Sequence, residues 1–225
     1  MHQSIDKKNK VAIYIIFLLI LSTNSGKFLE KQKRYSLKIY NIKVHGLTVD
    51  KNLEIQNDLS GIFYQNIFFL GKKKINKIIN KHNIIEEYKI KKIYPSTLNI
   101  EIKPTKFVAK ISTSNNIIVG SNGKLISGEK SEKILPYFFG EFNSKKFVKF
   151  KSNIEQSKFN FDEFKMVYFF PSNRWDILTI DDFLIKLPEN NVPRSLNKAY
   201  KIITSAQFKD KSIIDLRVKD RLIVK

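Results

Sequence analysis

Residues 94–102 read Tyr94-Pro95-Ser96-Thr97-Leu98-Asn99-Ile100-Glu101-Ile102. The Pro-Ser pair is typical of a turn, and the apolar residues that follow alternate strictly with polar ones. This period of two predicts a strand with one buried and one solvated face. The stretch therefore places a turn and a half-buried strand near the end of the first half of the chain.

The residues upstream of this strand predict a further strand and two helices. Residues 37–44 carry the apolar residues of a strand with one break in its alternation. Asp50 can cap a helix whose apolar residues fall at helical spacing, namely Ile55, Leu59, Ile62 and Phe63. A second helix is predicted after Gly71 and a strand around residues 88–90. Residues 36–107 are thus expected to form a strand, helix, helix, strand, strand (βααββ) unit.

The remaining residues, 108–225, predict mostly short strands. Residues 165–170 indicate an aromatic strand, and residues 174–187 indicate a hairpin that turns at Asp181-Asp182. Pro193 opens the one helix expected here, whose apolar stripe is Leu196, Tyr200 and Ile203. The predicted fold class is α+β: an amino-terminal membrane helix, a βααββ module, then a mostly antiparallel β domain with one late helix.

The amino-terminal segment carries an apolar run. Residues 11–21 are VAIYIIFLLIL, and no charge occurs across the 16 residues 11–26. As a helix this window spans roughly 24 Å, short of the ~30 Å hydrocarbon core, although Lys10 and Lys27 could extend to the interface. The window is either a single membrane anchor or a secretory signal with a cleavage point after Thr23-Asn24-Ser25. In both cases the residues that follow are expected outside the cytoplasm.

Composition excludes several function classes. The chain has no Cys, so a disulfide scaffold, a thiolate metal site and a cysteine nucleophile are excluded. Its 41 Lys and Arg against 21 Asp and Glu give a net charge of +20. The lysines are spread along the whole sequence, which indicates a solvated lysine-rich surface and not a nucleic-acid-binding face. No nucleic-acid partner is therefore expected.

The order of the blocks, and six short motifs, resemble the FtsQ/DivIB bacterial cell-division family. Residues 42–47 (IKVHGL) are similar to that family's "I-x-V-x-G-L" opening, and residues 94–102 resemble its "P-x-x-L-x-I-x-I" strand. In the β-rich block Gly123 matches the glycine of a "D-x-x-G" turn. The other motifs there are Leu135-Pro136-Tyr137-Phe138-Phe139-Gly140 ("L-P-x-x-x-G"), Arg174-Trp175-Asp176-Ile177 ("R-W-x-L") and Ile214-Asp215-Leu216-Arg217 ("I-D-L-R"). The resemblance covers nearly the whole chain.

Three features depart from the family's pattern. Pro104 and Phe107 stand where the family usually has Glu and then Pro, and only the following Ala109 agrees. Val218 replaces the aromatic residue often found after "D-L-R". The apolar segment is also short for the membrane anchor that the resemblance implies.

Motifs that carry catalysis are missing from the sequence. It contains no P-loop, GxGxxG, HExxH or GxSxG motif. The adjacent carboxylates Asp181-Asp182 are expected to be solvated turn residues, and His45 and His82 are expected at the ends of a strand and a helix. Trp175 is expected in the β core. We therefore expect no enzyme activity, no cofactor and no bound metal.

The resemblance implies a scaffold that binds other division proteins by adding a strand to the edge of its sheet. The βααββ unit resembles the POTRA module of that family. The resemblance implies FtsB/FtsL-like partners at the last strand, and recruitment by upstream division proteins through the POTRA module and membrane segment. The predicted partner-binding residues are Ile214, Asp215, Arg217, Val218, Asp220, Arg221, Leu222, Ile223 and Val224. Open backbone groups on an edge strand are the physical basis of this kind of binding.

The resulting domain organisation has five parts. These are a cytoplasmic tail (1–10), a transmembrane helix (11–26), a linker (27–35), a POTRA-like domain (36–107) and an FtsQ-type β domain (108–225). The implied localisation is the inner membrane, single-pass, with a cytoplasmic amino terminus and the bulk of the chain in the periplasm. The alternative is a POTRA-type chaperone of outer-membrane protein assembly or secretion, although such chains usually carry several POTRA units.

Overall fold

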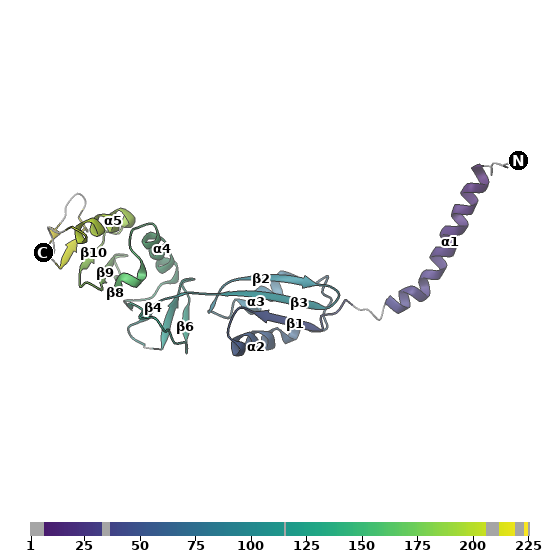
Figure 1. Cartoon of the computed structure of the whole chain (residues 1–225), viewed down its shortest axis with the longest axis horizontal. Coiled ribbons are helices and arrows are strands. Elements are labelled where there is room, and N and C mark those ends of the chain that lie inside the picture. Colours follow the sequence, from purple (N-terminus) through teal and green to yellow (C-terminus); the bar gives the residue numbers. More distant parts are fainter. Residues whose placement is uncertain (1–6, 33–36, 115, 206–211, 219–222, 225) are drawn as a thin grey trace. The chain divides into compact units, whose positions relative to one another are not determined.

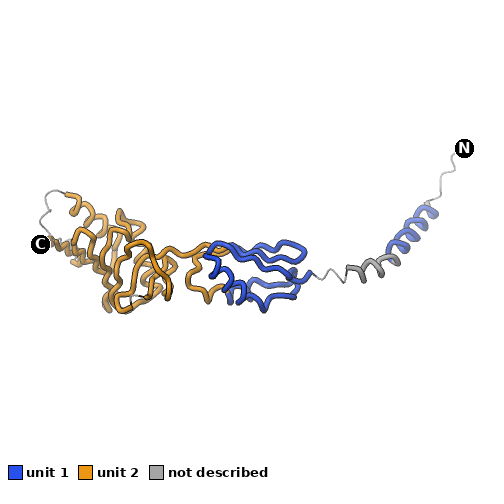
Figure 2. Tube along the Cα trace, turned by 60° about the horizontal axis from the view of Figure 1, so that its bottom comes forward, with its two compact units in different colours: residues 1–78, 89–101 blue, residues 79–88, 102–225 orange. Residues whose placement is uncertain are grey.

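The computed structural model describes all residues except 1–6, 33–36, 115, 206–211, 219–222 and 225 (Figure 1). The chain divides into two compact units (Figure 2). Unit 1 contains the chain up to residue 78 together with residues 89–101. Unit 2 contains residues 79–88 together with the chain from residue 102 onward.

The amino-terminal helix α1 covers Lys7–Gln32. Among the described residues, no helix combines the length and the apolar character that crossing a membrane requires. The prediction that the helix over 11–26 spans a membrane is therefore not confirmed. The physical reason is that the uncharged run is only 16 residues long and lies between lysines, with polar residues at its carboxyl end.

The first module has the predicted βααββ order. It consists of β1 (Asn41–His45), α2 (Val49–Asp58), the 3-10 turn η1 (Leu59–Ile62), α3 (Lys72–Ile79), β2 (Ile85–Ile93) and β3 (Thr97–Pro104). The three strands form one sheet in the order β1-β3-β2, with β1 parallel to β3. In this pairing Ile42 lies opposite Leu98 and Val44 lies opposite Ile100.

The alternation predicted for residues 98–102 is confirmed by burial. Leu98 and Ile100 are fully buried, Ile102 is nearly so, and Glu101 between them is exposed. The helices contribute buried residues at helical spacing, namely Ile55, Leu59, Ile62, Ile75 and Ile79. One detail of the prediction is wrong, because Asp50 does not cap α2. Thr48 holds that position, and Asp50 lies in the first turn.

Unit 2 is built on a nine-stranded sheet in the order β12-β11-β10-β9-β8-β7-β4-β5-β6. The strands are β4 (Phe107–Ile111), β5 (Ile117–Gly120), β6 (Leu125–Ser127), β7 (Tyr137–Phe139), β8 (Phe164–Phe169), β9 (Trp175–Thr179), β10 (Leu184–Lys186), β11 (Ile213–Asp215) and β12 (Ile223–Val224). The predicted hairpin is confirmed as the antiparallel pair β9–β10. The sheet is mixed, because β7 pairs in parallel with β4 and β8, and β10 pairs in parallel with β11.

The described residues of this unit contain two α-helices, and not the one predicted, together with the short 3-10 helix η2 (Phe161–Glu163). The late helix α5 covers Val192–Ile203, and a second helix, α4, covers Ser144–Glu155. The expectation of one late helix is therefore wrong. Residues 145–151 (KKFVKFK) mix lysines with aromatic and β-branched residues, a composition that suggests a strand. The buried residues Phe147, Phe150 and Ile154 nevertheless have helical spacing. Asn143 caps the helix, because its side chain accepts a hydrogen bond from the Lys146 backbone N–H.

Both helices pack on the same hydrophobic core as the sheet. Trp175 of β9 is buried, as predicted, and its ring stacks on that of Phe150 with centroids 4.0 Å apart and planes 6° apart. Phe138 of β7 lies edge-on to the same indole at 5.9 Å. From α5 the residues Val192, Leu196, Ala199 and Ile202 join this core. The core face of the sheet is thus covered by α4 and α5.

Gly140 shows why the "L-P-x-x-x-G" motif ends in glycine. Its φ angle is +107°, which side-chain-bearing residues rarely adopt. A Cβ atom at this position would also lie 2.1 Å from the backbone oxygen of Phe169 in the adjacent strand β8. Only glycine therefore allows the chain to leave β7 so close to β8.

The loop before β6 holds residues 79–88 within unit 2. The side chain of Asn122 donates hydrogen bonds to the backbone oxygens of Asn83 and Ile85, each at 2.9 Å. The Glu86 carboxylate accepts from the hydroxyls of Thr105 and Ser121, each at 2.7 Å. Burial acts to raise the pKa of Glu86, but these hydrogen bonds and nearby lysines lower it overall. The predicted domain boundary at 107/108 stays a prediction.

We predict that Phe150→Ala lowers the free energy of unfolding of unit 2 by about 3–5 kcal/mol, because it removes a fully buried aromatic ring and leaves a cavity. Trp175 is the only tryptophan, so its fluorescence should report the unfolding directly. The matched control is Lys149→Ala on the exposed side of the same helix, which should change stability by less than about 0.5 kcal/mol. Equal effects of the two substitutions would contradict the assignment of α4 as a core helix.

Candidate partner interface

The strand β12 lies at one edge of the nine-stranded sheet. It pairs antiparallel with β11 through Ile214 opposite Val224 and Asp215 opposite Ile223. No strand of the described residues pairs with its other side. The backbone N–H and C=O groups on that side can therefore pair with a strand supplied by another chain.

The strand that pairs with this edge, β11, is firmly attached to the core. Ile214 is fully buried, and Leu216, just beyond β11, is 6% exposed. Backbone bonds join β11 to β10 at both ends, from the Leu184 N–H to the Ser212 oxygen at 2.7 Å and from the Leu216 N–H to the Lys186 oxygen at 2.9 Å. The edge is thus supported by a strand that cannot shift without disturbing the core.

Charged residues line up across the strands on the face opposite the core. Asp176 of β9 lies opposite Lys186 of β10, and Lys186 lies opposite Asp215 of β11. Their neighbours Ile177, Ile185 and Ile214 are all fully buried on the core face. The row alternates acid, base, acid, so each residue has an oppositely charged neighbour on the next strand, an arrangement that stabilises a sheet.

Asp215 and Arg217 form a bidentate ion pair next to the edge. The Arg217 Nε lies 2.8 Å and 3.0 Å from the two carboxylate oxygens, and the Arg217 backbone N–H also donates to the carboxylate. These hydrogen bonds outweigh partial burial and lower the pKa of Asp215, and they raise the pKa of Arg217. The pair fixes the direction of the chain as it leaves β11.

The pKa of the Asp176 carboxyl is shifted in the opposite direction to that of Asp215. Its side chain is only 7% exposed, and burial raises the pKa of this carboxyl in spite of the Arg174 guanidinium, whose Nε lies 3.3 Å away. Arg174 in turn lies over the ring of Phe170 at 4.4 Å. Arg174 and Asp176, the charged residues of the "R-W-x-L" motif, are thus held by contacts within the sheet at β9 and do not lie at the open edge.

A hollow of about 540 Å³ lies beside the segment that follows β11. Its lining includes three cationic side chains, Arg194 and Lys198 of α5 and Arg217, and one acidic residue, Glu189. Arg194 and Lys198 are exposed and one helical turn apart. The hollow therefore offers a positively charged recess next to the end of β11, the strand that pairs with β12.

The nine predicted partner-binding residues fall into three groups. Val218 and Ile223 are exposed, at 53% and 44%. Ile214 is buried, Val224 packs partly against the core, and Asp215 and Arg217 are paired with each other. Asp220, Arg221 and Leu222 lie outside the described residues. Sequence reasoning missed Lys186, Arg194 and Lys198, because only the register of β10 and the placement of α5 bring them close to Asp215 and Arg217.

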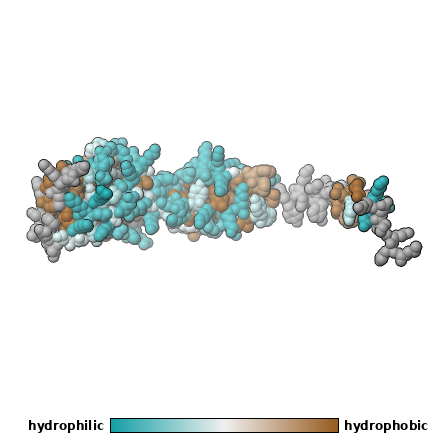
Figure 3. Space-filling model, turned by 90° about the horizontal axis from the view of Figure 1, so that it is seen from above, coloured by the Kyte–Doolittle hydropathy of each residue, from teal (hydrophilic) through white to brown (hydrophobic). Residues whose placement is uncertain are grey.

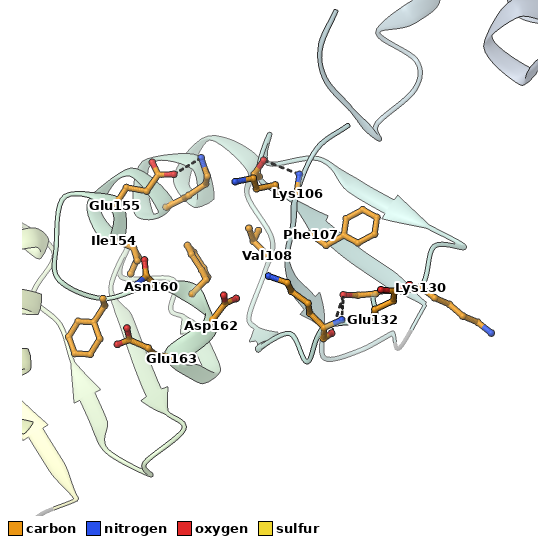
Figure 4. Close-up of a pocket in the computed structure, with 16 residues that line it drawn as sticks. Lys106, Phe107, Val108, Lys130, Glu132, Ile154, Glu155, Asn160, Asp162 and Glu163 are labelled. Carbon is orange, nitrogen blue, oxygen red and sulfur yellow. Dashed lines mark hydrogen bonds and ion pairs between the residues drawn. The ribbon is translucent and has the colours of Figure 1, made fainter. Parts of the chain in front are cut away.

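A second hollow, of about 810 Å³, lies between the β4 region and α4 (Figure 4). Its lining mixes acidic and basic residues, and Lys151 pairs with Glu155 at 3.0 Å. No histidine lines it. The described residues also contain no group of three or more His, Asp or Glu side chains that could hold a metal ion.

The fold defines a two-module protein, with a POTRA-type βααββ module followed by a β-rich module that ends in an open edge strand. Residues 37–103 match the family model described as "POTRA domain, FtsQ-type", and residues 109–217 match "Cell division protein FtsQ/DivIB, C-terminal". The chain belongs to the FtsQ/DivIB family of cell division proteins. The predicted resemblance is confirmed. No curated protein matches the chain.

We predict that Asp215→Asn destabilises the folded protein at neutral pH by on the order of 1 kcal/mol, because a partly exposed bidentate ion pair is lost. The carboxyl's pKa is lowered on folding, so its contribution is complete above the ordinary value of 3.8 and disappears as pH falls through the lowered value. Urea unfolding of both proteins should therefore give a difference that shrinks in strong acid. Asp181→Asn, in an exposed turn, is the control and should show no such trend.

Proposed function

We propose that the protein is a non-enzymatic scaffold of the bacterial division complex that binds FtsB/FtsL-like proteins by β-strand addition at β12. The observation that carries the proposal is the open side of β12 in the described sheet. An incoming strand would gain affinity from backbone hydrogen bonds, which depend little on sequence, and specificity from alternate side chains. Family membership supports a role in division complexes.

The side chains at the edge give the incoming strand two different environments. Ile223 shares the face of Asp215, which is the face of the sheet opposite the helices α4 and α5, and it is 44% exposed. Val224 packs partly against the core. A partner strand would continue both rows, placing one set of side chains beside Ile223 and the other beside Val224. We expect an apolar residue of the partner to contact Ile223 and extend the sheet surface.

The charge around the edge favours an acidic partner segment. Arg194 and Lys198 line the hollow beside the end of β11 and outnumber the single Glu189, while Arg217 in the same lining is already paired with Asp215. Complementary charge raises the rate of association more than the affinity, and its effect falls with salt. An acidic residue next to the pairing strand would thus find a cationic recess within reach.

The localisation proposed is the inner membrane, with a single anchor in residues 11–26 and the two modules in the periplasm. The motive is the 16-residue uncharged run together with family membership. Upstream division proteins would contact the POTRA module and the anchor. This arrangement would leave the β12 edge free for partners on the same side of the membrane.

We predict that proline substitution separates partner binding from folding. Consecutive backbone N–H groups of a strand point to opposite sides, so one of Ile223 and Val224 directs its N–H toward β11 and the other directs it outward. Proline at the outward position should abolish binding of an FtsB–FtsL complex, because it removes a pairing donor. Proline at the other position should mainly weaken the β11–β12 pair. Binding can be measured by calorimetry with the purified partner pair.

The control is the melting temperature, which must stay within a few degrees of wild type in the variant that loses binding. Ile223→Ala keeps the backbone donor and should reduce affinity far less than proline. If both proline variants fold and bind normally, the interface lies elsewhere, and the edge strands of the POTRA sheet, β1 and β2, are the next candidates, because the strand Thr97–Lys103 is paired on both sides.

The anchor makes a separate prediction. The chain extracted from membranes should keep its amino-terminal segment, since the family resemblance implies an anchor and not a signal peptide. Intact-mass spectrometry of the extracted protein measures this directly. A mature amino terminus close to Gly26 would instead identify residues 1–25 as a cleaved signal.

A further inference from the structure

One end of unit 1 exposes an unusual number of large apolar side chains. Three segments meet there, residues 37–40, 63–74 and 91–96, and we call them together the tip surface. Residues 37–101 contain nine exposed large hydrophobic residues, and all but Val49 and Leu53 belong to the tip surface, namely Leu37, Tyr40, Tyr64, Phe68, Phe69, Ile93 and Tyr94. Figure 3 shows this concentration as a hydrophobic region at the end of the module where the chain enters at residue 37.

Hydrogen bonds and ring contacts hold the three segments together. The Ile67 N–H donates to the Leu37 oxygen and the Tyr64 N–H to the Ile39 oxygen, which joins the first two segments. The Tyr40 N–H donates to the Ser96 oxygen, and Lys92 Nζ donates to the oxygens of Phe68 and Leu70, which attaches the third. The tip surface is therefore a built part of the module, and its exposed rings are held in place by the core beneath them.

The aromatic side chains project from this frame into solvent. Phe69 is 79% exposed, Tyr64 68% and Phe68 62%. Tyr40 and Tyr64 meet edge to face at 5.8 Å, and Phe68 and Phe69 do so at 5.4 Å. These pairs form a rigid apolar surface without covering one another. Exposed apolar patches of this kind mark sites of interaction with another molecule.

The charge of the tip surface is entirely positive. Its 22 residues include six lysines, Lys38, Lys72, Lys73, Lys74, Lys91 and Lys92, and no Asp or Glu. Lys72, Lys73 and Lys74 are all exposed at the start of α3, directly after the aromatic pair. Aromatic rings beside lysines, without carboxylates, fit the headgroup region of an anionic bilayer, where rings lie at the interface and lysines meet lipid phosphates.

The tip surface also lies close along the chain to the apolar run of α1. From Leu21 to Gln32 the helix rises roughly 16 Å, and the five backbone steps from Gln32 to Leu37 span at most about 18 Å. A membrane that holds residues 11–21 is therefore within about 35 Å of the tip surface. A protein partner would be expected to present carboxylates to six lysines, whereas the anionic bilayer supplies both complementary features at once.

We propose that the tip surface docks the POTRA module onto the surface of an anionic lipid bilayer, with Phe68, Phe69 and Tyr64 in the interface and the Lys72–Lys74 cluster on the lipid phosphates. This inference rests on the proposed membrane localisation. It adds a second contact between the chain and the bilayer, besides the anchor. Docking would orient the module relative to the membrane and keep its aromatic end out of reach of other periplasmic proteins.

The absence of Cys makes a direct test possible, because one introduced cysteine can be labelled at a unique position. The full chain carrying Phe69→Cys is labelled with an environment-sensitive fluorophore and reconstituted into vesicles of phosphatidylcholine with phosphatidylglycerol. The matched control is Val49→Cys, which is on α2 of the same unit and is 74% exposed. We expect a blue shift and quenching by headgroup-level nitroxide lipids at position 69, and neither at position 49.

Charge is tested by K72Q/K73Q/K74Q in the labelled Phe69→Cys chain. Each lysine near an anionic surface changes partitioning about fivefold, so the docked-to-undocked ratio should fall on the order of 100-fold. Vesicles of phosphatidylcholine alone should give a similar loss. Unchanged docking in both cases would show that anionic lipid is not what the tip surface recognises.

Vesicle flotation separates the possible failures. If the chain floats but position 69 remains as water-exposed as position 49, the docking inference is wrong and the anchor stands. If the chain does not float, both the anchor and the docking inference fail, while binding of partners at β12 is judged by the proline variants. Shielding of position 69 only after a division protein is added would overturn the lipid proposal and identify the tip surface as a protein-binding site.

Discussion

The stacking of Phe150 on Trp175 joins helix α4 to the middle of the large sheet, and the arrangement of unit 2 depends on this contact. Because α4 and α5 bury the same face of the sheet, the strands β9, β10 and β11 have one core face and one helix-free face. That division decides which side chain of every strand is available to a partner. The packing of Trp175 in the core thus determines which side chains of the distant edge strand β12 face a partner.

An exposed strand edge is a liability that most proteins avoid, since it can pair with any extended chain. Here the edge strand β12 has two described residues, Ile223 and Val224, and it pairs with a strand held rigidly by β10. Rigid support lowers the conformational cost of strand addition, because only the incoming segment must become ordered. The ion pair of Asp215 and Arg217 adds to this support by fixing the chain just after β11.

The two modules present different chemistry for recognition. The edge at β12 offers backbone hydrogen bonds and the end of the neighbouring strand β11 adds a cationic recess, which suits a peptide strand with acidic residues. The tip surface of unit 1 offers aromatic rings and lysines without carboxylates, which suits an extended anionic surface. A scaffold can use such a difference to bind its partner and its membrane without competition between them.

The sequence alone determined those features that depend on local spacing. The period of two in residues 98–102, the helix that begins near Pro193, and the turn glycines Gly123 and Gly140 all encode local conformation, and together with the order of motifs they identified the family. The predicted stripe of that helix was right only in Leu196, because Ala199 and Ile202 are its other buried residues and Tyr200 and Ile203 are partly buried. Helix α4 was missed because KKFVKFK combines helical spacing with the composition of a strand, and packing of Phe150 on Trp175 decides between them. The tertiary structure alone decided the strand order, the row of Asp176, Lys186 and Asp215, and the meeting of three distant segments at the tip surface. These depend on long-range pairing, which no local pattern in the chain specifies.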